Sequence, residues 1–187
     1  VAHVEAGLRT DNIYSPYPEE MNRRLADRLA EIYYAPTEAA ERSLLRERAS
    51  PDHILVTGNT VIDALLATAA TEPPLWEQAL AKALRRPGPK ILATVHRRES
   101  WGAPMERVAL AIKKVCLRVP TATFIFPIHL NPVVRAIFHD ALGDIPQVVF
   151  CEPLPYRPFV HLMKTVDVVI TDSGGIQEEA PTLGKPV

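Results

Sequence analysis

Short apolar runs rich in β-branched residues alternate along the chain with longer segments whose apolar residues recur every three or four positions. The short runs predict buried strands and the longer segments predict amphipathic helices. Strands are predicted at 32–37, 53–60, 90–96, 122–129, 147–153 and 166–171, and the end of another at 1–7. Helices are predicted at 19–32, 37–49, 60–70, 104–119, 132–142 and 157–166, and a further one follows the glycines at 174–175.

This alternation predicts an α/β fold class, because near-continuous β-branched runs between helices are typical of parallel strands buried on both faces. The segment 71–90 carries prolines and changes in character, so we place a domain boundary there and expect domains at 1–72 and 73–187. The chain begins at Val1 inside an apolar-flanked motif and stops in Gly-Lys-Pro-Val. Both ends resemble cuts through structure, and we expect a fragment of a longer protein.

Polar residues gather where the predicted strands end. They are His3-Val4-Glu5, Gly58-Asn59, residues 96–99, residues 129–132 and residues 172–175. Ligands of parallel α/β sheets bind at the carboxyl ends of the strands. Several polar loops at one edge therefore predict a ligand crevice between the two domains.

Composition changes this picture little. The chain has 47% hydrophobic and 23% charged residues and a net charge of −1, so bulk charge gives no case for nucleic acid or an anionic membrane. No apolar run is long enough to span a bilayer, and there is no signal-peptide pattern. Cys116 and Cys151 lie in or beside apolar runs, which favours reduced core residues of a cytoplasmic protein.

Residues 173–175, Ser-Gly-Gly, join an apolar strand to the next helix. Glycine lets a ligand approach the backbone closely, and a helix N-terminus attracts anions such as phosphate. A tight turn that needs glycine only to close is an equally good interpretation of so short a motif.

Acids and histidines in the other loops also allow two interpretations. Glu5 and Glu19 could serve as acid–base residues, but an acid in the first helical turn, such as Glu19, also interacts well with the helix dipole. His96 opens a His-Arg-Arg-Glu cluster that could be a cap or a salt-bridged surface. His129 and Asn131 precede a proline and could form an ordinary turn.

Six motifs then occur in order over the whole chain: HVEAGLRT, PEEMNRR, VTGNTVIDAL, HRRES, PIHLNPVV and DSGGIQEEAPTLGKPV. In these the chain closely resembles the non-hydrolysing UDP-N-acetylglucosamine 2-epimerases. The resemblance implies two Rossmann-like parallel-sheet domains that face a cleft, the GT-B type, both incomplete here. It implies interconversion of UDP-N-acetylglucosamine and UDP-N-acetylmannosamine through a glycal. Relatives carry earlier strands, with a basic residue and an aspartate of the catalytic site, before the position of Val1.

The resemblance also gives roles to residues. It implies that Glu5 and Glu19 act as acid–base residues and that His96 lies near the diphosphate in the catalytic cleft. Arg9 would orient the substrate, and His129 and Asn131 would line the same cleft. Arg97 contacts a second, regulatory UDP-N-acetylglucosamine in some relatives.

For the glycine motif, the resemblance implies that Ser173, Gly174 and Gly175 donate to the diphosphate. Glu179, one turn into the helix, would accept both ribose hydroxyls, because a carboxylate has two oxygens for a vicinal diol. Glu178 points elsewhere and is expected to be structural. We expect no metal and no cofactor, and a homodimer in the full-length protein, with UDP-N-acetylglucosamine and UDP as its ligands.

Three alternatives stay open. A hydrolysing relative would release free N-acetylmannosamine and UDP, and product analysis separates the two. A GT-B glycosyltransferase would use the same glycines and ribose carboxylate, but the paired acids at Glu5 and Glu19 argue against it. The chain by itself could also be an inactive module that retains only UDP affinity.

Overall fold

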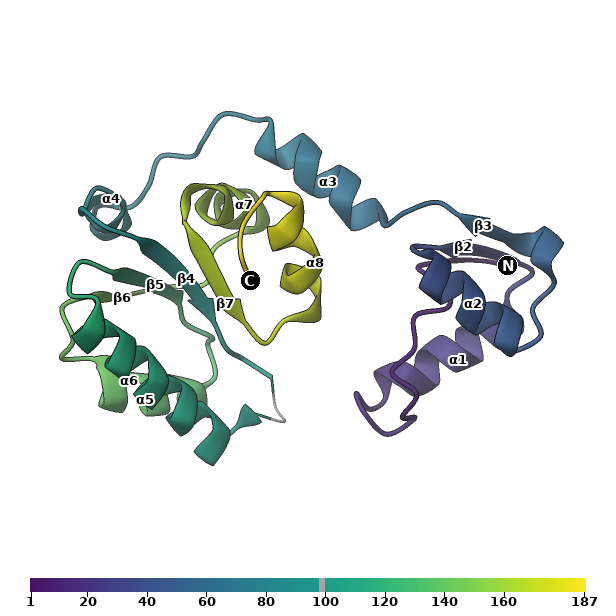
Figure 1. The fold of residues 1–187 in the computed structure, drawn as a ribbon, viewed down its shortest axis with the longest axis horizontal. Coiled ribbons are helices and arrows are strands. Elements are labelled where there is room, and N and C mark those ends of the chain that lie inside the picture. Colours follow the sequence, from purple (N-terminus) through teal and green to yellow (C-terminus); the bar gives the residue numbers. More distant parts are fainter. Residues whose placement is uncertain (98–99) are drawn as a thin grey trace. The chain divides into compact units, whose positions relative to one another are not determined.

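The computed structural model describes residues 1–97 and 100–187, so Arg98 and Glu99 of the predicted polar cluster lie outside the described residues. The chain divides into two compact units, Val1–Asp63 and Ala64–Val187. Each unit has its own parallel sheet (Figure 1). The predicted α/β class with parallel sheets is therefore confirmed.

The first unit has three strands in the order β1-β2-β3, all parallel. They are β1 (Ala2–Val4), β2 (Ile32–Ala35) and β3 (Ile54–Val56). Its helices are α1 (Glu19–Leu29) and α2 (Glu38–Arg46), followed by the short 3-10 helix η1 (Pro51–His53). Helix α2 begins after Thr37, whose side-chain oxygen accepts a hydrogen bond from the Ala40 N–H at 3.1 Å.

The apolar core of the first unit is small. It joins Ala35 and Ile54 of the sheet to Ala40 and Leu44 of α2. Helix α1 contributes little to it: Leu25 and Leu29, whose spacing predicts the helix, are 57% and 73% exposed. The buried residues of α1 are acidic, so polar contacts described below hold this helix in place.

The described residues of the second unit form four parallel strands in the order β6-β5-β4-β7. They are β4 (Lys90–Thr94), β5 (Thr123–Pro127), β6 (Val148–Cys151) and β7 (Val168–Thr171). The helices are α4 (Gln78–Leu84), α5 (Ala103–Arg118), α6 (Pro132–Leu142), α7 (Tyr156–Thr165) and α8 (Gly174–Thr182), and α3 (Thr60–Ala69) spans the division between the units.

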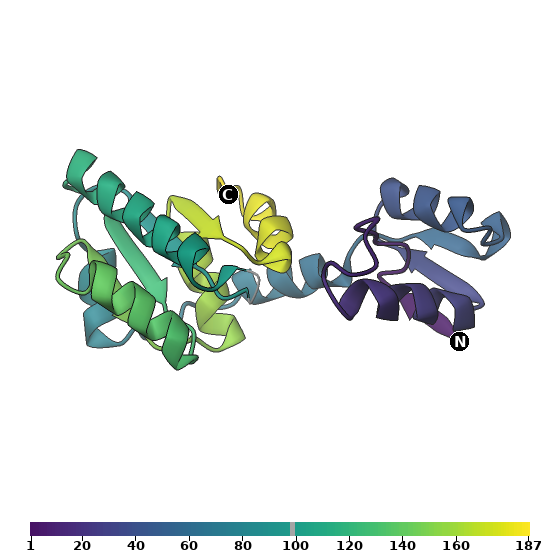
Figure 2. The same cartoon turned by 90° about the horizontal axis from the view of Figure 1, so that it is seen from below.

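Helices α5 and α6 lie side by side over one face of the second sheet (Figures 1 and 2). Their apolar faces meet side chains of β4 and β5 in one large core, where the rings of Phe126 and Phe138 lie 4.7 Å apart. Both faces of the central strands are buried, because Leu92 and Ile125, which point away from α5 and α6, have no exposed surface. The loops at the strand ends of the second unit are thus supported by a sheet whose central strands are buried on both faces.

The chain beyond Asp63 packs with the second unit. Lys164 on α7 donates to the carbonyl of Ala69 at 2.8 Å, and Arg157 donates to that of Glu72 at 2.7 Å. The division into units therefore falls inside α3, earlier than the domain boundary that the sequence predicts after residue 72. Within the described residues, no helix is long and apolar enough to cross a membrane.

Gly7, in the loop after β1, has a φ of +83° and no space for a side chain. A Cβ there would lie 2.3 Å from the Ala40 carbonyl oxygen and 2.8 Å from Leu44 Cγ. Gly58 has a similar φ of +80°, but a Cβ would meet nothing within 4 Å.

We expect Gly7→Ala to lower the free energy of unfolding by ~3 kcal/mol or more, because backbone strain and overlap with α2 add together. Gly58→Ala is the matched control and should cost only about 1 kcal/mol, the conformational term alone. Urea unfolding of both variants measures the difference, and equal costs would contradict the tight packing of Gly7.

Candidate active site

The edge of the second sheet is organised where β4 and β7 end side by side. The hydroxyls of Thr94 and Thr171 are 2.8 Å apart, and beyond them the two chains separate into loops. Asp172 follows β7, and its carboxylate accepts hydrogen bonds from the backbone N–H groups of His96 and Arg97 at 3.0 and 2.8 Å. One side chain therefore ties the loop after β4 to the loop after β7.

His96 is exposed beside this carboxylate. Its Nδ1 lies 3.2 Å from Asp172 Oδ1, and its imidazole stacks on that of His129 with ring centres 6.0 Å apart. A carboxylate partner favours a proton on Nδ1, which turns Nε2 toward other partners. The two histidines predicted at separate strand ends, of β4 and β5, are thus brought together.

Asn131, which follows His129 in the loop after β5, has a structural role. Asn131 is the N-cap of α6, and its side-chain oxygen accepts from the Val133 N–H at 2.9 Å. Its own N–H donates to His129 Nδ1 at 3.2 Å, so the neutral His129 ring carries its proton on Nε2. Asn131 therefore fixes the orientation of His129.

Helix α8 begins at Gly174, directly after Ser173, which is its N-cap. Gly174 and Gly175 both have helical backbone, so the turn itself does not require glycine at either position. A Cβ on Gly174 would lie 3.3 Å from Arg97 Nη2. The first N–H groups of a helix have no partner within it, so this end is open to an acceptor, with a guanidinium beside it.

Glu179 lies within the same helix and is buried, with 7% of its surface exposed. Burial raises the pKa of its carboxyl, and the Tyr156 hydroxyl, which donates to Oε1 at 3.3 Å, opposes that rise. Burial and the nearby Glu179 in turn raise the pKa of Tyr156. Because the Tyr156 hydroxyl binds Oε1 of Glu179, it helps to fix the direction in which Oε2 points.

A pocket of about 250 Å³ opens at this edge of the second unit. Its polar lining comes from His96, His129 and Thr94, and the rest is apolar, from Val95, Pro127, Pro153, Leu154, Phe159 and Ile176. An apolar pocket with a few convergent polar groups is the usual form of a small-molecule site.

The first unit carries the two predicted acid–base residues, one directly after β1 and the other at the start of α1. Glu5 follows β1, is exposed, and has a φ of +64°. Glu19 is the first residue of α1 and is exposed. The neighbouring Glu20 is fully buried and accepts from the Thr10 N–H at 3.2 Å, which ties the start of α1 to the loop that carries Glu5.

Arg9 lies in that same loop, and its side chain is only 3% exposed. Its guanidinium donates to both oxygens of Glu47 at 2.7 and 2.8 Å and to Asp27 Oδ2 at 2.6 Å. Asp27 also contacts His3 Nδ1 at 2.5 Å. These bonds hold the guanidinium of Arg9 within the first unit, and its expected role in binding and orienting substrate stays a prediction.

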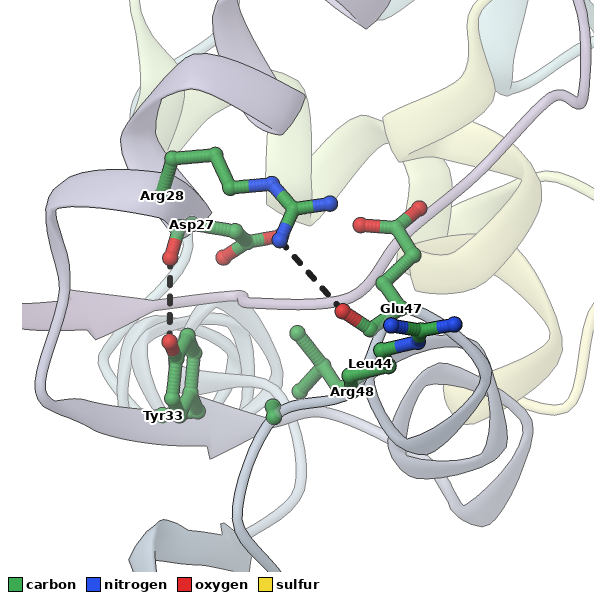
Figure 3. A pocket seen from close by; sticks show the side chains of 7 residues that line it. Asp27, Arg28, Tyr33, Leu44, Glu47 and Arg48 are labelled. Carbon is green, nitrogen blue, oxygen red and sulfur yellow. Dashed lines mark hydrogen bonds between the residues drawn. The ribbon is translucent and has the colours of Figure 1, made fainter.

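Behind this network lies a small pocket of about 100 Å³, drawn in Figure 3. Tyr33 donates to the carbonyl of Asp27 at 3.0 Å, and Arg28 donates to that of Glu47 at 3.4 Å (Figure 3). These bonds fasten α1 to β2 and to the end of α2, which explains how α1 stays in place with few buried apolar side chains.

Comparison with known proteins places these motifs in a family. The family model described as UDP-N-acetylglucosamine 2-epimerase matches residues 1–187. The chain belongs to this family. A UDP-N-acetylglucosamine 2-epimerase of Neisseria meningitidis is 46% identical over 192 aligned residues, which cover 100% of this chain and 51% of that protein.

Solved structures of related proteins also match the fold of this chain. A Neisseria meningitidis UDP-GlcNAc 2-epimerase bound to UDP-GlcNAc matches with a TM-score of 0.89 and 44% identity, over 100% of this chain and 52% of that one. A structure of S. aureus MnaA with UDP matches with a TM-score of 0.92 and 40% identity, over 100% and 50%. The chain thus spans about half the length of the family members it matches.

Two residues of the site make contacts that the sequence does not predict. Asp172 has a recognisable signal, since it is the first polar residue after a buried strand, but its partners lie 75 and 76 residues earlier in the chain. Tyr156 begins α7 and has no signal at all, because its contact with Glu179 depends on how α7 and α8 pack.

The pairing of Arg9 with Glu47 makes stability depend on pH. The hydrogen bond from Arg9 holds the pKa of Glu47 below its usual value in the folded state. The stabilisation is therefore present above the unfolded pKa, about 4.3, and is lost as pH falls through the lower folded value.

We expect Glu47→Gln to lower the free energy of unfolding at pH 7 by about 1–3 kcal/mol and to flatten its decline below about pH 4.3. The control is Glu38→Gln, which breaks an exposed pair with Arg42 and should cost ~0.5 kcal/mol or less. Urea unfolding at pH 7, 4 and 3 tests this, and an unchanged pH dependence in Glu47→Gln would count against the network.

Proposed function

We propose that the protein is a UDP-N-acetylglucosamine 2-epimerase that interconverts UDP-N-acetylglucosamine and UDP-N-acetylmannosamine. A base removes the C2 proton while the bond from C1 to the UDP oxygen breaks, which leaves a glycal and UDP. UDP then adds back to C1, and an acid returns a proton to the other face of C2. The observation that carries the proposal is the convergence of His96 and Arg97 on the glycine-bearing start of α8.

We place the diphosphate at the start of α8, beside His96 and Arg97. Gly174 and Gly175 are helical, so the lack of side chains there serves a close approach to the backbone and not a turn. The helix end and the Arg97 guanidinium supply positive charge, and Ser173 adds a hydroxyl. His96 lies at the same edge and stabilises the leaving UDP by a hydrogen bond or a proton.

Uridine is assigned to Glu179. Its carboxylate is buried and one of its oxygens already accepts from Tyr156, so the group is held in place before a ligand arrives. Ribose hydroxyls would add donors to this carboxylate and favour its ionised form, against the effect of burial.

Proton transfer is assigned to Glu5 and Glu19. The left-handed backbone of Glu5 costs free energy for a side chain of this type, and such strain tends to persist at functional sites. Glu19 is exposed at the start of α1, next to Glu20, whose carboxylate accepts from the Thr10 N–H of the same loop. Their meeting with His96 across a cleft stays a prediction, as do the homodimer, the cytoplasmic location, the regulatory role of Arg97 and the absence of a metal or cofactor.

Proton exchange at C2 tests the reaction directly. The complete protein that contains this chain should introduce deuterium at C2 of UDP-N-acetylglucosamine in D₂O and form UDP-N-acetylmannosamine, both seen by proton NMR. Release of free N-acetylmannosamine would instead indicate a hydrolysing enzyme, and UDP binding without exchange a binding module.

We expect Glu5→Gln, Glu19→Gln and His96→Asn each to slow C2 exchange by about 10²–10⁴-fold, the usual worth of a general acid or base. Glu38→Gln is the matched control, because Glu38 begins α2 as Glu19 begins α1. If Glu19→Gln behaves as this control does, Glu19 serves only the helix dipole.

The ribose contact predicts a ligand-dependent effect. Glu179→Gln should weaken UDP binding by about tenfold or more, since hydrogen bonds to a charged acceptor are worth roughly 1.5–3 kcal/mol. It should hardly affect binding of the 2′,3′-dideoxy analogue of UDP, which has no ribose hydroxyls. Isothermal titration of both ligands measures this, with Glu178→Gln as the neighbouring control, and an equal loss for both ligands would remove Glu179 from the ribose site.

A further inference from the structure

Asp172 makes more contacts at the strand ends than a surface turn requires. Its carboxylate accepts from the His96 N–H through both oxygens, at 3.2 and 3.0 Å, and from the Arg97 N–H at 2.8 Å. Its side chain is 19% exposed, so water competes little for these bonds. Its own N–H donates to Thr94 O at 3.3 Å, which continues the pairing of β4 and β7.

The same residue holds two side chains. His96 Nδ1 lies 3.2 Å from Oδ1, and Arg97 Nε donates to the carbonyl of Asp172 at 2.6 Å. The first contact turns Nε2 of His96 away from Asp172, and the second lays the guanidinium of Arg97 against Gly174. Asp172 thereby orients both the imidazole of His96 and the guanidinium of Arg97.

We propose that Asp172 is the positioning residue of the diphosphate end of the site. It sets the orientation of His96 and Arg97 relative to the N-terminus of α8, and so determines how well the leaving UDP is stabilised. The inference rests on the proposed function, because it assigns a UDP diphosphate to this edge. Asp172 does not itself touch the reacting atoms.

The chain supplies a matched control at the opposite end of the same strand pair. Asp167 precedes β7, and its carboxylate accepts from the Lys90 N–H at 2.7 Å, at the start of β4. Both aspartates therefore fasten β4 to β7 through backbone N–H groups, but only Asp172 lies at the ligand edge. A purely structural role would make their substitutions alike.

The experiment compares Asp172→Ala, Asp172→Asn and Asp167→Ala in the complete protein that contains this chain. Each variant is measured by thermal unfolding, UDP affinity, kcat and KM for epimerisation, and hydrogen exchange at the amides of His96 and Arg97. We expect Asp172→Ala to speed exchange at these amides, to weaken UDP binding and to lower kcat by about 10²-fold, the cost of a small misplacement of catalytic groups.

Asp172→Asn keeps one acceptor oxygen and should recover part of the loss. Asp167→Ala should lower thermal stability similarly while leaving UDP affinity and kcat within about twofold, since surface changes far from a site usually act on stability alone. Equal losses of affinity in Asp172→Ala and Asp167→Ala, or an Asp172→Ala enzyme as active as the wild type, would overturn the proposal.

Failure of the proposed function gives a different pattern. If the wild-type protein binds UDP but exchanges no hydrogen at C2, the epimerase function is refuted. The role of Asp172 is then tested by comparing the UDP affinities of Asp172→Ala and Asp167→Ala. A wild-type protein without UDP affinity overturns both.

Discussion

The pairing of β4 with β7 is the contact on which the second unit's site depends. It joins segments 77 residues apart in sequence, and it ends in a bond between two threonine hydroxyls. Parallel strands deliver their carboxyl ends to the same edge of a sheet, so the loops that follow must share that edge. Because the two strands are adjacent, the histidine after one and the glycines after the other become neighbours. The diphosphate site that we propose at this edge thus depends on the strand order.

Charge, more than apolar contact, holds the corresponding edge of the first unit. Arg9 comes from a loop, Asp27 from α1 and Glu47 from the C-cap of α2. Their contacts take the place of apolar packing, because Leu25 and Leu29 of α1 are exposed. Buried ion pairs of this kind contribute little net stability but are costly to break, because the remaining partner keeps a buried, unpaired charge. The loop with Glu5 is therefore held in one arrangement.

Much of the fold could be predicted from the sequence, because both signals that predict it are local. Period and turn residues indicate the alternation of strands and helices, and the motif at 173–175 marks the start of α8. The exposure of Leu25 and Leu29 could not be predicted, since spacing gives a helix but not what covers it. The contacts of Asp172 and Tyr156 could not be predicted for a similar reason. Their partners are determined by packing between elements distant in the sequence, which no local pattern records.

The left-handed backbone at Glu5 sets stability against the acid–base role that we propose for its side chain. Glycine or asparagine would adopt a φ of +64° more readily, so the carboxylate is kept at a conformational cost. Selection for stability alone would drive this position toward glycine, whereas selection for turnover would keep the acid. Among descendants of this sequence that lose the need for catalysis, position 5 is thus one of the first places where drift should become visible.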